Sequence, residues 1–184
     1  RSTDYYTAGN QTGKRPDRAT IVYANRAKEA FPDTPLIIGG LEASLRRFAH
    51  YDYWEDKVRR SILLDTKADI LTYGMGERAS IEIAARLKAK EPVSSIKNVR
   101  GTCVLADHED LCEYPNVKCP SYEDVSSDKV KYAQANIMQY NEHDAVSGKA
   151  ILQPHGDKIL ICNPPQPPLT TEEMDKYAEL PYMR

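Results

Sequence analysis

The fold is decided by the stretch Pro35–Glu42, PLIIGGLE, in which a short apolar run ends in a double glycine. Such a run is typical of a strand that is buried on both faces of a parallel sheet. A second run, Ala68–Tyr73, is closed in the same way by Gly74–Glu77 and is followed by a helical pattern. Strand, glycine turn and helix thus occur twice, which predicts an α/β fold with a doubly wound parallel sheet.

Hydrophobic spacing predicts the elements around these two units. Apolar residues three and four apart favour a helix from Asp17 to Phe31 and another helix that is begun by Ser126 or Ser127. The second helix is expected to bury a face formed by Val130, Ala133, Ile137 and Tyr140. Residues 106–125 are expected to be irregular. The other predicted elements are helices over 42–48, 58–63 and 81–87, a strand over 99–105, and a hairpin of 150–153 with 158–162.

The chain is expected to have three parts. Residues 1–16 form an N-terminal loop, residues 17–162 form the α/β domain, and residues 163–184 form a connector and a short helix. The connector begins with Asn163–Pro168, which has four prolines without amide donors and should therefore be extended. Because the first residue is Arg1 and not methionine, we expect a piece of a longer protein.

Composition excludes several classes of protein. The 184 residues include 25 Lys and Arg against 27 Asp and Glu, so a strongly basic surface for non-specific nucleic-acid binding is excluded. All apolar runs are far shorter than the ~18 residues of a membrane-spanning helix. The segment Arg1–Tyr6 has no apolar core of a signal peptide, and four cysteines are present. We therefore expect a cytoplasmic chain with reduced thiols.

The two glycine turns are the first candidate site, because open α/β sheets bind ligands where strands end and helices begin. A right-handed crossover would place both turns on one edge of the sheet. The candidate ligand-binding residues are Gly39, Gly40, Glu42, Gly74, Gly76 and Glu77. The two glutamates favour a cationic or neutral ligand in this crevice. A purely structural role of the turns remains the alternative.

The second turn also fits the dinucleotide fingerprint G-x-G-x-x-A through Gly74, Gly76 and Ala79. Glu77, however, lies where a pyrophosphate needs bare amide groups, and its charge would oppose the phosphates. We therefore do not expect NAD or FAD to bind.

Four soft side chains give the spacing C-x4-H-x3-C-x6-C, at Cys103, His108, Cys112 and Cys119. Structural zinc sites usually contain a close cysteine pair that fixes two ligands on one turn, and this spacing has none. The chain also lacks the C-x3-C-x2-C spacing that would hold an iron-sulfur cluster. We predict neither zinc nor a cluster in this chain.

A basic and aromatic stretch is the third candidate. Its side chains are Arg46, Arg47, His50, Tyr51, Tyr53, Trp54, Arg59 and Arg60. Such residues can stack bases and hold phosphates, so a scaffold or nucleic-acid-binding module that uses Arg46 to Arg60 is an alternative function. Asp52, Glu55 and Asp56 offset the charge, which favours ion pairs on a solvated surface. His50 has no visible partner for acid-base chemistry.

Several long strings resemble one protein family. They are residues 14–20, 35–54, 68–78, 163–165 and 169–182, and together they closely resemble the N-terminal region of the YgiQ family of radical SAM proteins. The resemblance implies a partial flavodoxin-like sheet, similar to a cobalamin-binding domain. It also implies a parent Fe-S oxidoreductase of unknown substrate, in which a 4Fe-4S cluster reduces S-adenosyl-L-methionine and a 5'-deoxyadenosyl radical abstracts hydrogen.

Two departures limit what this chain can do alone. The family's C-x3-C-x2-C cluster motif follows the point where the chain stops, and the D-x-H-x-x-G segment of cobalamin domains is absent. The resemblance therefore implies no catalytic residue here and leaves cobalamin open. The implied partner is the radical SAM core of the same polypeptide, and neither a membrane nor a nucleic acid is expected.

Overall fold

The computed structural model describes residues 3–182, so the outermost residues of the predicted N-terminal loop and C-terminal connector, 1–2 and 183–184, lie outside the described residues. The main sheet consists of β1 (Ile37–Ile38), β4 (Ile70–Thr72), β5 (Thr102–Ala106), β6 (Asn116–Lys118), β7 (Ala150–His155) and β8 (Lys158–Cys162). These six strands lie in the order β1-β4-β5-β8-β7-β6. A separate hairpin joins β2 (His50–Asp52) to β3 (Lys57–Arg59).

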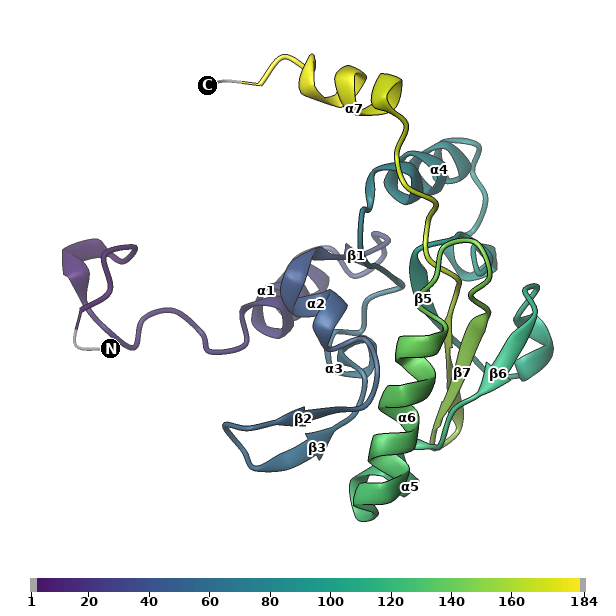
Figure 1. Ribbon diagram of the computed structural model, residues 1–184. Coiled ribbons are helices and arrows are strands. Elements are labelled where there is room, and N and C mark those ends of the chain that lie inside the picture. The colour runs from purple at the N-terminus through teal and green to yellow at the C-terminus, as the bar shows by residue number, and fades with distance from the viewer. Residues whose placement is uncertain (1–2, 183–184) are drawn as a thin grey trace.

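Helices cover both faces of the sheet (Figure 1). They are α1 (Ala19–Ala30), α2 (Gly40–Leu45), α3 (Ile62–Thr66), α4 (Glu77–Lys88), α5 (Tyr122–Ser127) and α6 (Lys129–Asn141). Helix α7 (Thr171–Ala178) lies away from the sheet. Three short 3-10 turns are Ala8–Asn10, Val93–Ser95 and Glu109–Leu111.

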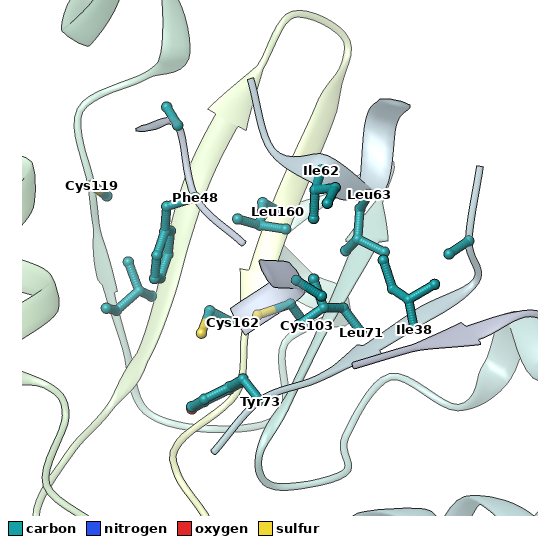
Figure 2. Packing of buried hydrophobic residues seen from close by; sticks show 14 of the residues in the cluster. Ile38, Phe48, Ile62, Leu63, Leu71, Tyr73, Cys103, Cys119, Leu160 and Cys162 are labelled. Carbon is teal, nitrogen blue, oxygen red and sulfur yellow. The ribbon is translucent and has the colours of Figure 1, made fainter. Parts of the chain in front are cut away.

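Two apolar clusters form the core, one on each face of the sheet. Strand side chains alternate between the faces, so Leu71 and Cys103 point to one cluster while Ile70 and Val104 point to the other. The first cluster, part of which Figure 2 shows, packs against α1, α2, α3, α5 and α6. The second packs against α4 and residues 93–99. This double coverage explains why the central strands are mainly apolar, and it confirms the α/β class.

The parallel pairing predicted for the two glycine-turn strands is confirmed, because β1 and β4 are parallel with Ile37 opposite Ile70. The sheet as a whole is mixed, although the partial flavodoxin-like prediction emphasised its parallel strands. Strand β5 runs antiparallel to both β4 and β8, and β7 is antiparallel to β8. After α4 the chain returns to the edge where β4 ended, and the Tyr73 N–H donates to the Gly101 carbonyl at 2.9 Å. Strand β5 therefore starts at this edge and must run antiparallel to β4.

The buried face predicted for the long helix is wrong. Helix α6 begins at Lys129, and its cap is Asp128 in place of a serine. Val130, Ala133, Ile137 and Tyr140 are exposed, with Tyr140 at 84%. The helix instead buries Ala135 and packs the partly buried Tyr132 and Met138 against the core.

Short elements with polar residues differ from expectation. Val58 lies in β3, so the helix predicted over 58–63 is limited to the segment from Ile62. Residues 106–125, expected to be irregular, contain β6 and the start of α5. The hairpin around Gly156 is confirmed, and this glycine has a φ of 64°.

Candidate functional site

The two glycine turns lie on one edge of the sheet, as predicted. A Cβ added to Gly39 would lie 2.5 Å from Thr72 Oγ1, and one added to Gly76 would lie 3.6 Å from the same atom. Both turns therefore meet at Thr72, the last residue of β4. We call this surface, formed by Gly39–Leu45 and Gly74–Glu77, the glycine-turn edge.

Backbone conformation explains why glycine is needed at two of these positions. Gly40 has a φ of 81° and Gly74 a φ of 67°, which residues with a side chain rarely adopt. These conformations turn the chain sharply from β1 into α2 and from β4 toward α4. The edge is thus a product of strand-to-helix turns.

The two glutamates differ in what they can do. The Glu42 carboxylate accepts hydrogen bonds from the Thr20 amide and hydroxyl at 3.0 and 2.8 Å, and it pairs with Arg46 at 3.2 Å. Through Oε2, Glu42 therefore holds the first turn of α1, while Oε1 forms the ion pair with Arg46. Glu77 is exposed in the first turn of α4. Of the predicted pair, Glu77 alone faces solvent.

Apolar side chains at this edge are unusually exposed. Leu41 and Leu45 follow one another on the same side of α2, and they are 78% and 69% exposed. Met75, between the glycines of the second turn, is 48% exposed. Clustered apolar exposure of this kind marks a surface for another protein segment. The edge therefore resembles a docking surface more than a pocket for a small charged ligand.

Behind the edge lies a buried cluster that the sequence did not reveal. Cys103 and Cys162 are directly opposite each other on β5 and β8, and Figure 2 shows both beside Tyr73. The Tyr73 hydroxyl donates to the Asn163 carbonyl, and the Arg47 guanidinium carbon lies 4.7 Å from the centre of the Tyr73 ring. Cys103 and Cys162 are brought together by the register of β5 with β8. Residue spacing along the sequence does not reveal this register.

Electrostatics in this cluster follow from burial and from one cation. Burial raises the pKa of the Cys103 thiol and of the Tyr73 hydroxyl. Burial also opposes ionisation of Cys162, but hydrogen bonding with Cys103 and the charge of Arg47 lower the pKa of this thiol. Arg47 thus lies against the most acidic thiol of the cluster.

The proline-rich connector is extended and packs on the domain, as predicted. The Gly101 amide donates to the Pro164 carbonyl at 2.8 Å, and Arg100 Nε donates to the Pro165 carbonyl at 3.0 Å. Further along, Arg78 donates to the carbonyls of Pro167 and Pro168 and pairs with Glu173 of α7. Two arginines therefore fix the path by which the chain leaves the sheet.

The cysteines and histidine considered as zinc ligands are dispersed. Cys103 lies beside Cys162, whereas Cys119 contacts the Gln153 amide at 3.7 Å. Within residues 3–182, no group of three or more His, Cys, Asp or Glu side chains could hold a metal ion. The structure therefore offers no cluster or zinc site in this range.

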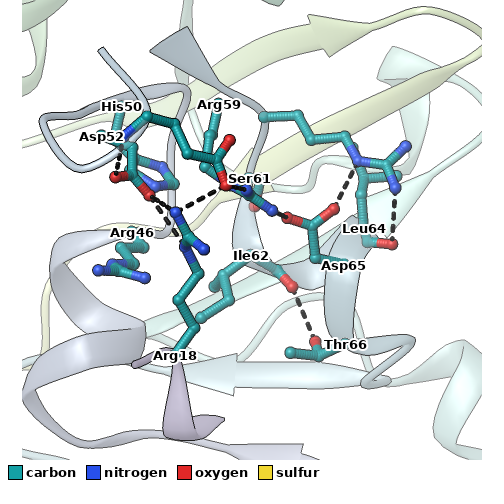
Figure 3. Close-up of polar contacts among 12 residues, drawn as sticks. Arg18, Arg46, His50, Asp52, Arg59, Ser61, Ile62, Leu64, Asp65 and Thr66 are labelled. Carbon is teal, nitrogen blue, oxygen red and sulfur yellow. Dashed lines mark hydrogen bonds and ion pairs between the residues drawn. The ribbon is translucent and has the colours of Figure 1, made fainter. Parts of the chain in front are cut away.

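The basic and aromatic stretch is largely an internal ion-pair network (Figure 3). Arg59 pairs with Glu55 and Asp65, Arg60 pairs with Asp65, and Arg46 pairs with Glu42. Burial lowers the pKa of His50, whose Nδ1 lies 3.1 Å from the Phe48 carbonyl.

This arrangement gives no support to nucleic-acid binding, which an RNA-binding assay would test.

Comparison with known proteins decides the family. The family model described as Radical SAM N-terminal matches residues 1–184. The chain belongs to the Radical SAM N-terminal family. This Radical SAM N-terminal chain is similar to UPF0313 proteins of Clostridium botulinum and Geobacter sulfurreducens, with identities of 52% over 185 residues and 50% over 184 residues. No solved structure matches it.

The Radical SAM N-terminal chain is similar to only part of each relative. All of the chain is matched, but it spans 28% of the Clostridium botulinum protein and 30% of the Geobacter sulfurreducens protein. It therefore corresponds to an N-terminal region of a larger protein, and the resemblance found in the sequence is confirmed. Membership implies S-adenosyl-L-methionine and a 4Fe-4S cluster for the full-length protein. In the described range, no helix is long and apolar enough to cross a membrane.

Proposed function

We propose that this chain is the accessory domain of a radical SAM Fe-S oxidoreductase, and that its glycine-turn edge docks onto the catalytic core of the same polypeptide. The observation that carries the proposal is the exposure of Leu41, Leu45 and Met75 at this edge. Apolar side chains gain free energy when they leave water, so a covered edge is more stable than a free one.

The length of the relatives supports the choice of occupant. More than two thirds of the Clostridium botulinum protein lies outside the match, since the chain covers 28% of it. Within one polypeptide the two parts are held at high effective concentration, so a modest apolar contact is sufficient for docking. The core is therefore the occupant that we propose for this edge.

The residues present do not fit the family's cofactors. The cysteines are dispersed in the described part of the chain, so the 4Fe-4S cluster and the S-adenosyl-L-methionine that it reduces belong to the core. Neither Gly39–Leu45 nor Gly74–Glu77 contains a histidine that could ligate cobalamin. The role of this chain is to cover the core and to orient it, and we assign it no step of the reaction.

The test uses the full-length protein that contains this chain. After anaerobic reconstitution, the protein should cleave S-adenosyl-L-methionine to 5'-deoxyadenosine. The double variant Leu41→Glu/Leu45→Glu should lose most of this activity, because two charges would have to be buried at the interface. Val130→Glu, a change at an equally apolar exposed site on α6, should not.

Two results would overturn different parts of this proposal. Absence of 5'-deoxyadenosine from the reconstituted parent would contradict the radical SAM assignment. Equal rates in the parent and in the double variant would contradict docking through the glycine-turn edge, while the enzymatic assignment would stand.

A further inference from the structure

We propose that Arg47 is the centre of a binding site for a small anionic ligand, one that presents a carboxylate or a phosphate. The site is an open cavity between α6 and the loop that follows α2. It differs from the apolar surface proposed for docking, and it does not depend on that proposal.

Arg47 is held in place from several sides. Its guanidinium carbon lies 4.7 Å from the centre of the Tyr73 ring and 5.0 Å from the centre of the Phe48 ring. One terminal nitrogen, Nη1, donates to the Ser44 carbonyl at 2.6 Å. Two rings and a carbonyl thus fix the plane of the guanidinium, so that little freedom is lost when a ligand binds.

Within residues 3–182, this cation has no carboxylate partner. The other arginines of the same stretch, Arg46, Arg59 and Arg60, all pair with Asp or Glu. Two thiols and a phenol influence Arg47, and of these the acidic Cys162 thiol also hydrogen-bonds its guanidinium. The Nε atom of Arg47 is buried and has no hydrogen-bond partner among the residues that the structure describes. Buried charges are normally paired, and cation-π attraction is weaker than the cost of burying a cation. An anion in the cavity would supply the charged partner that the Nε atom lacks.

The cavity has room for such a ligand and suitable groups around it. Its volume is about 660 Å³. The lining residues are Arg47, Gln139, Tyr140, Asn141, His143 and Asp144. Side-chain amides at Gln139 and Asn141 can donate to anionic oxygens, and His143 lies near Tyr73, with 6.4 Å between the ring centres. The set is rich in donors around one fixed cation.

The one carboxylate in the lining is engaged elsewhere. Asp144 Oδ1 accepts from the Val146 and Ser147 amides at 2.9 and 2.6 Å and from the Ser147 hydroxyl at 2.8 Å. The Asp144 carboxylate therefore stabilises the turn formed by residues 144–147. Arg100 Nη2 donates to the Ala145 carbonyl at 2.6 Å and anchors this loop from outside the cavity. The cavity wall is thus preformed.

The experiment measures binding of inorganic phosphate, pyrophosphate and citrate by calorimetry at low ionic strength, in the full-length protein. Citrate tests carboxylate recognition, and the two phosphates test recognition of a tetrahedral anion. We expect at least one probe to bind and its affinity to fall about tenfold or more in Arg47→Met, which keeps an unbranched apolar stem and removes the charge and the donors. Arg47→Lys should keep part of the affinity, because lysine keeps the positive charge but lacks the planar guanidinium that donates two parallel hydrogen bonds.

Folding is monitored by circular dichroism, and His143→Gln provides a second variant at the exposed rim, where little stability is at stake. A weaker affinity in His143→Gln with an unchanged fold would support the site even if Arg47→Met failed to fold. Absence of binding by all three probes, or equal affinity in the parent and both variants, would overturn the proposal. Binding to the 184-residue chain but not to the full-length protein would also overturn it, since a carboxylate of the core would then occupy Arg47.

Discussion

The close approach of the two glycine turns can be tested by adding one methyl group. In Gly39→Ala the new Cβ would lie 2.5 Å from Thr72 Oγ1, whereas ordinary contacts begin at 3.4 Å. The φ of Gly39 is −166°, an extended conformation that alanine also adopts, so the cost comes from the contact and not from the backbone. Thr72 is β-branched and buried, so it cannot easily rotate away.

Overpacking of this kind costs ~1–3 kcal/mol, and the lower entropy of the unfolded alanine chain returns ~0.4–1 kcal/mol. We therefore expect Gly39→Ala to lower the free energy of unfolding by about 1–2 kcal/mol. Urea denaturation followed by circular dichroism measures this difference. Gly76→Ala is the matched control, since its Cβ would lie at an ordinary 3.6 Å from the same oxygen.

A double-mutant cycle identifies the atom responsible. In a Thr72→Ala background the Gly39→Ala change should cost ~1 kcal/mol less, whereas Thr72→Val retains an atom at the contact and should give no relief. An unchanged stability of Gly39→Ala, or an equal loss in the parent and the Thr72→Ala background, would show that the two turns do not meet at Thr72.

Two further predictions concern the buried polar groups of β7. Burial lowers the pKa of His155 to about 4, so its stabilisation is complete above the unfolded pKa of 6.5 and is lost as the pH falls toward 4. This loss of unfolding free energy amounts to ~3 kcal/mol. The variant His155→Phe keeps the stack on Tyr122 but cannot be protonated. Its unfolding free energy should therefore fall less between pH 6.5 and 4 than that of the parent. Equal falls in unfolding free energy in the parent and in His155→Phe would contradict this role of His155. Gln153 accepts from the Ala49 amide at 2.8 Å and donates to the Pro120 carbonyl at 3.1 Å. Gln153→Leu leaves both groups unsatisfied and should cost ~2–4 kcal/mol in urea denaturation; a loss below ~1 kcal/mol would show that water replaces both bonds.

Sequence patterns predicted the elements whose burial is two-sided. Strands β1 and β4 are continuous apolar runs closed by glycine turns, and this local signal was sufficient to place them parallel and to bring their turns to one edge. The strands of the hairpin around Gly156 were predicted for the same reason, because a turn glycine separates two apolar runs. Local pattern and tertiary packing agree in these segments.

Elements that depend on distant partners were missed. The polar strands β2, β3 and β6 carry little apolar signal, since they lie in a hairpin or at the end of the sheet. Helix α6 has apolar residues on two sides, and the pattern could not show that Ala135 packs inward while Ile137 is exposed. The Arg47 cluster depends on the register of β5 with β8, which joins Cys103 to Cys162 across the fold.

Photocrosslinking can show whether the glycine-turn edge docks onto the rest of the polypeptide. A benzoylphenylalanine is placed at Leu41 of the full-length protein, and a second variant has it at Val130, on the end of α6 away from the glycine turns (Figure 1). Mass spectrometry of the irradiated protein then identifies the crosslinked peptides. We predict crosslinks from Leu41 to residues beyond those matched by this chain, and few or none from Val130. Crosslinks from Val130 alone would contradict docking through the glycine-turn edge.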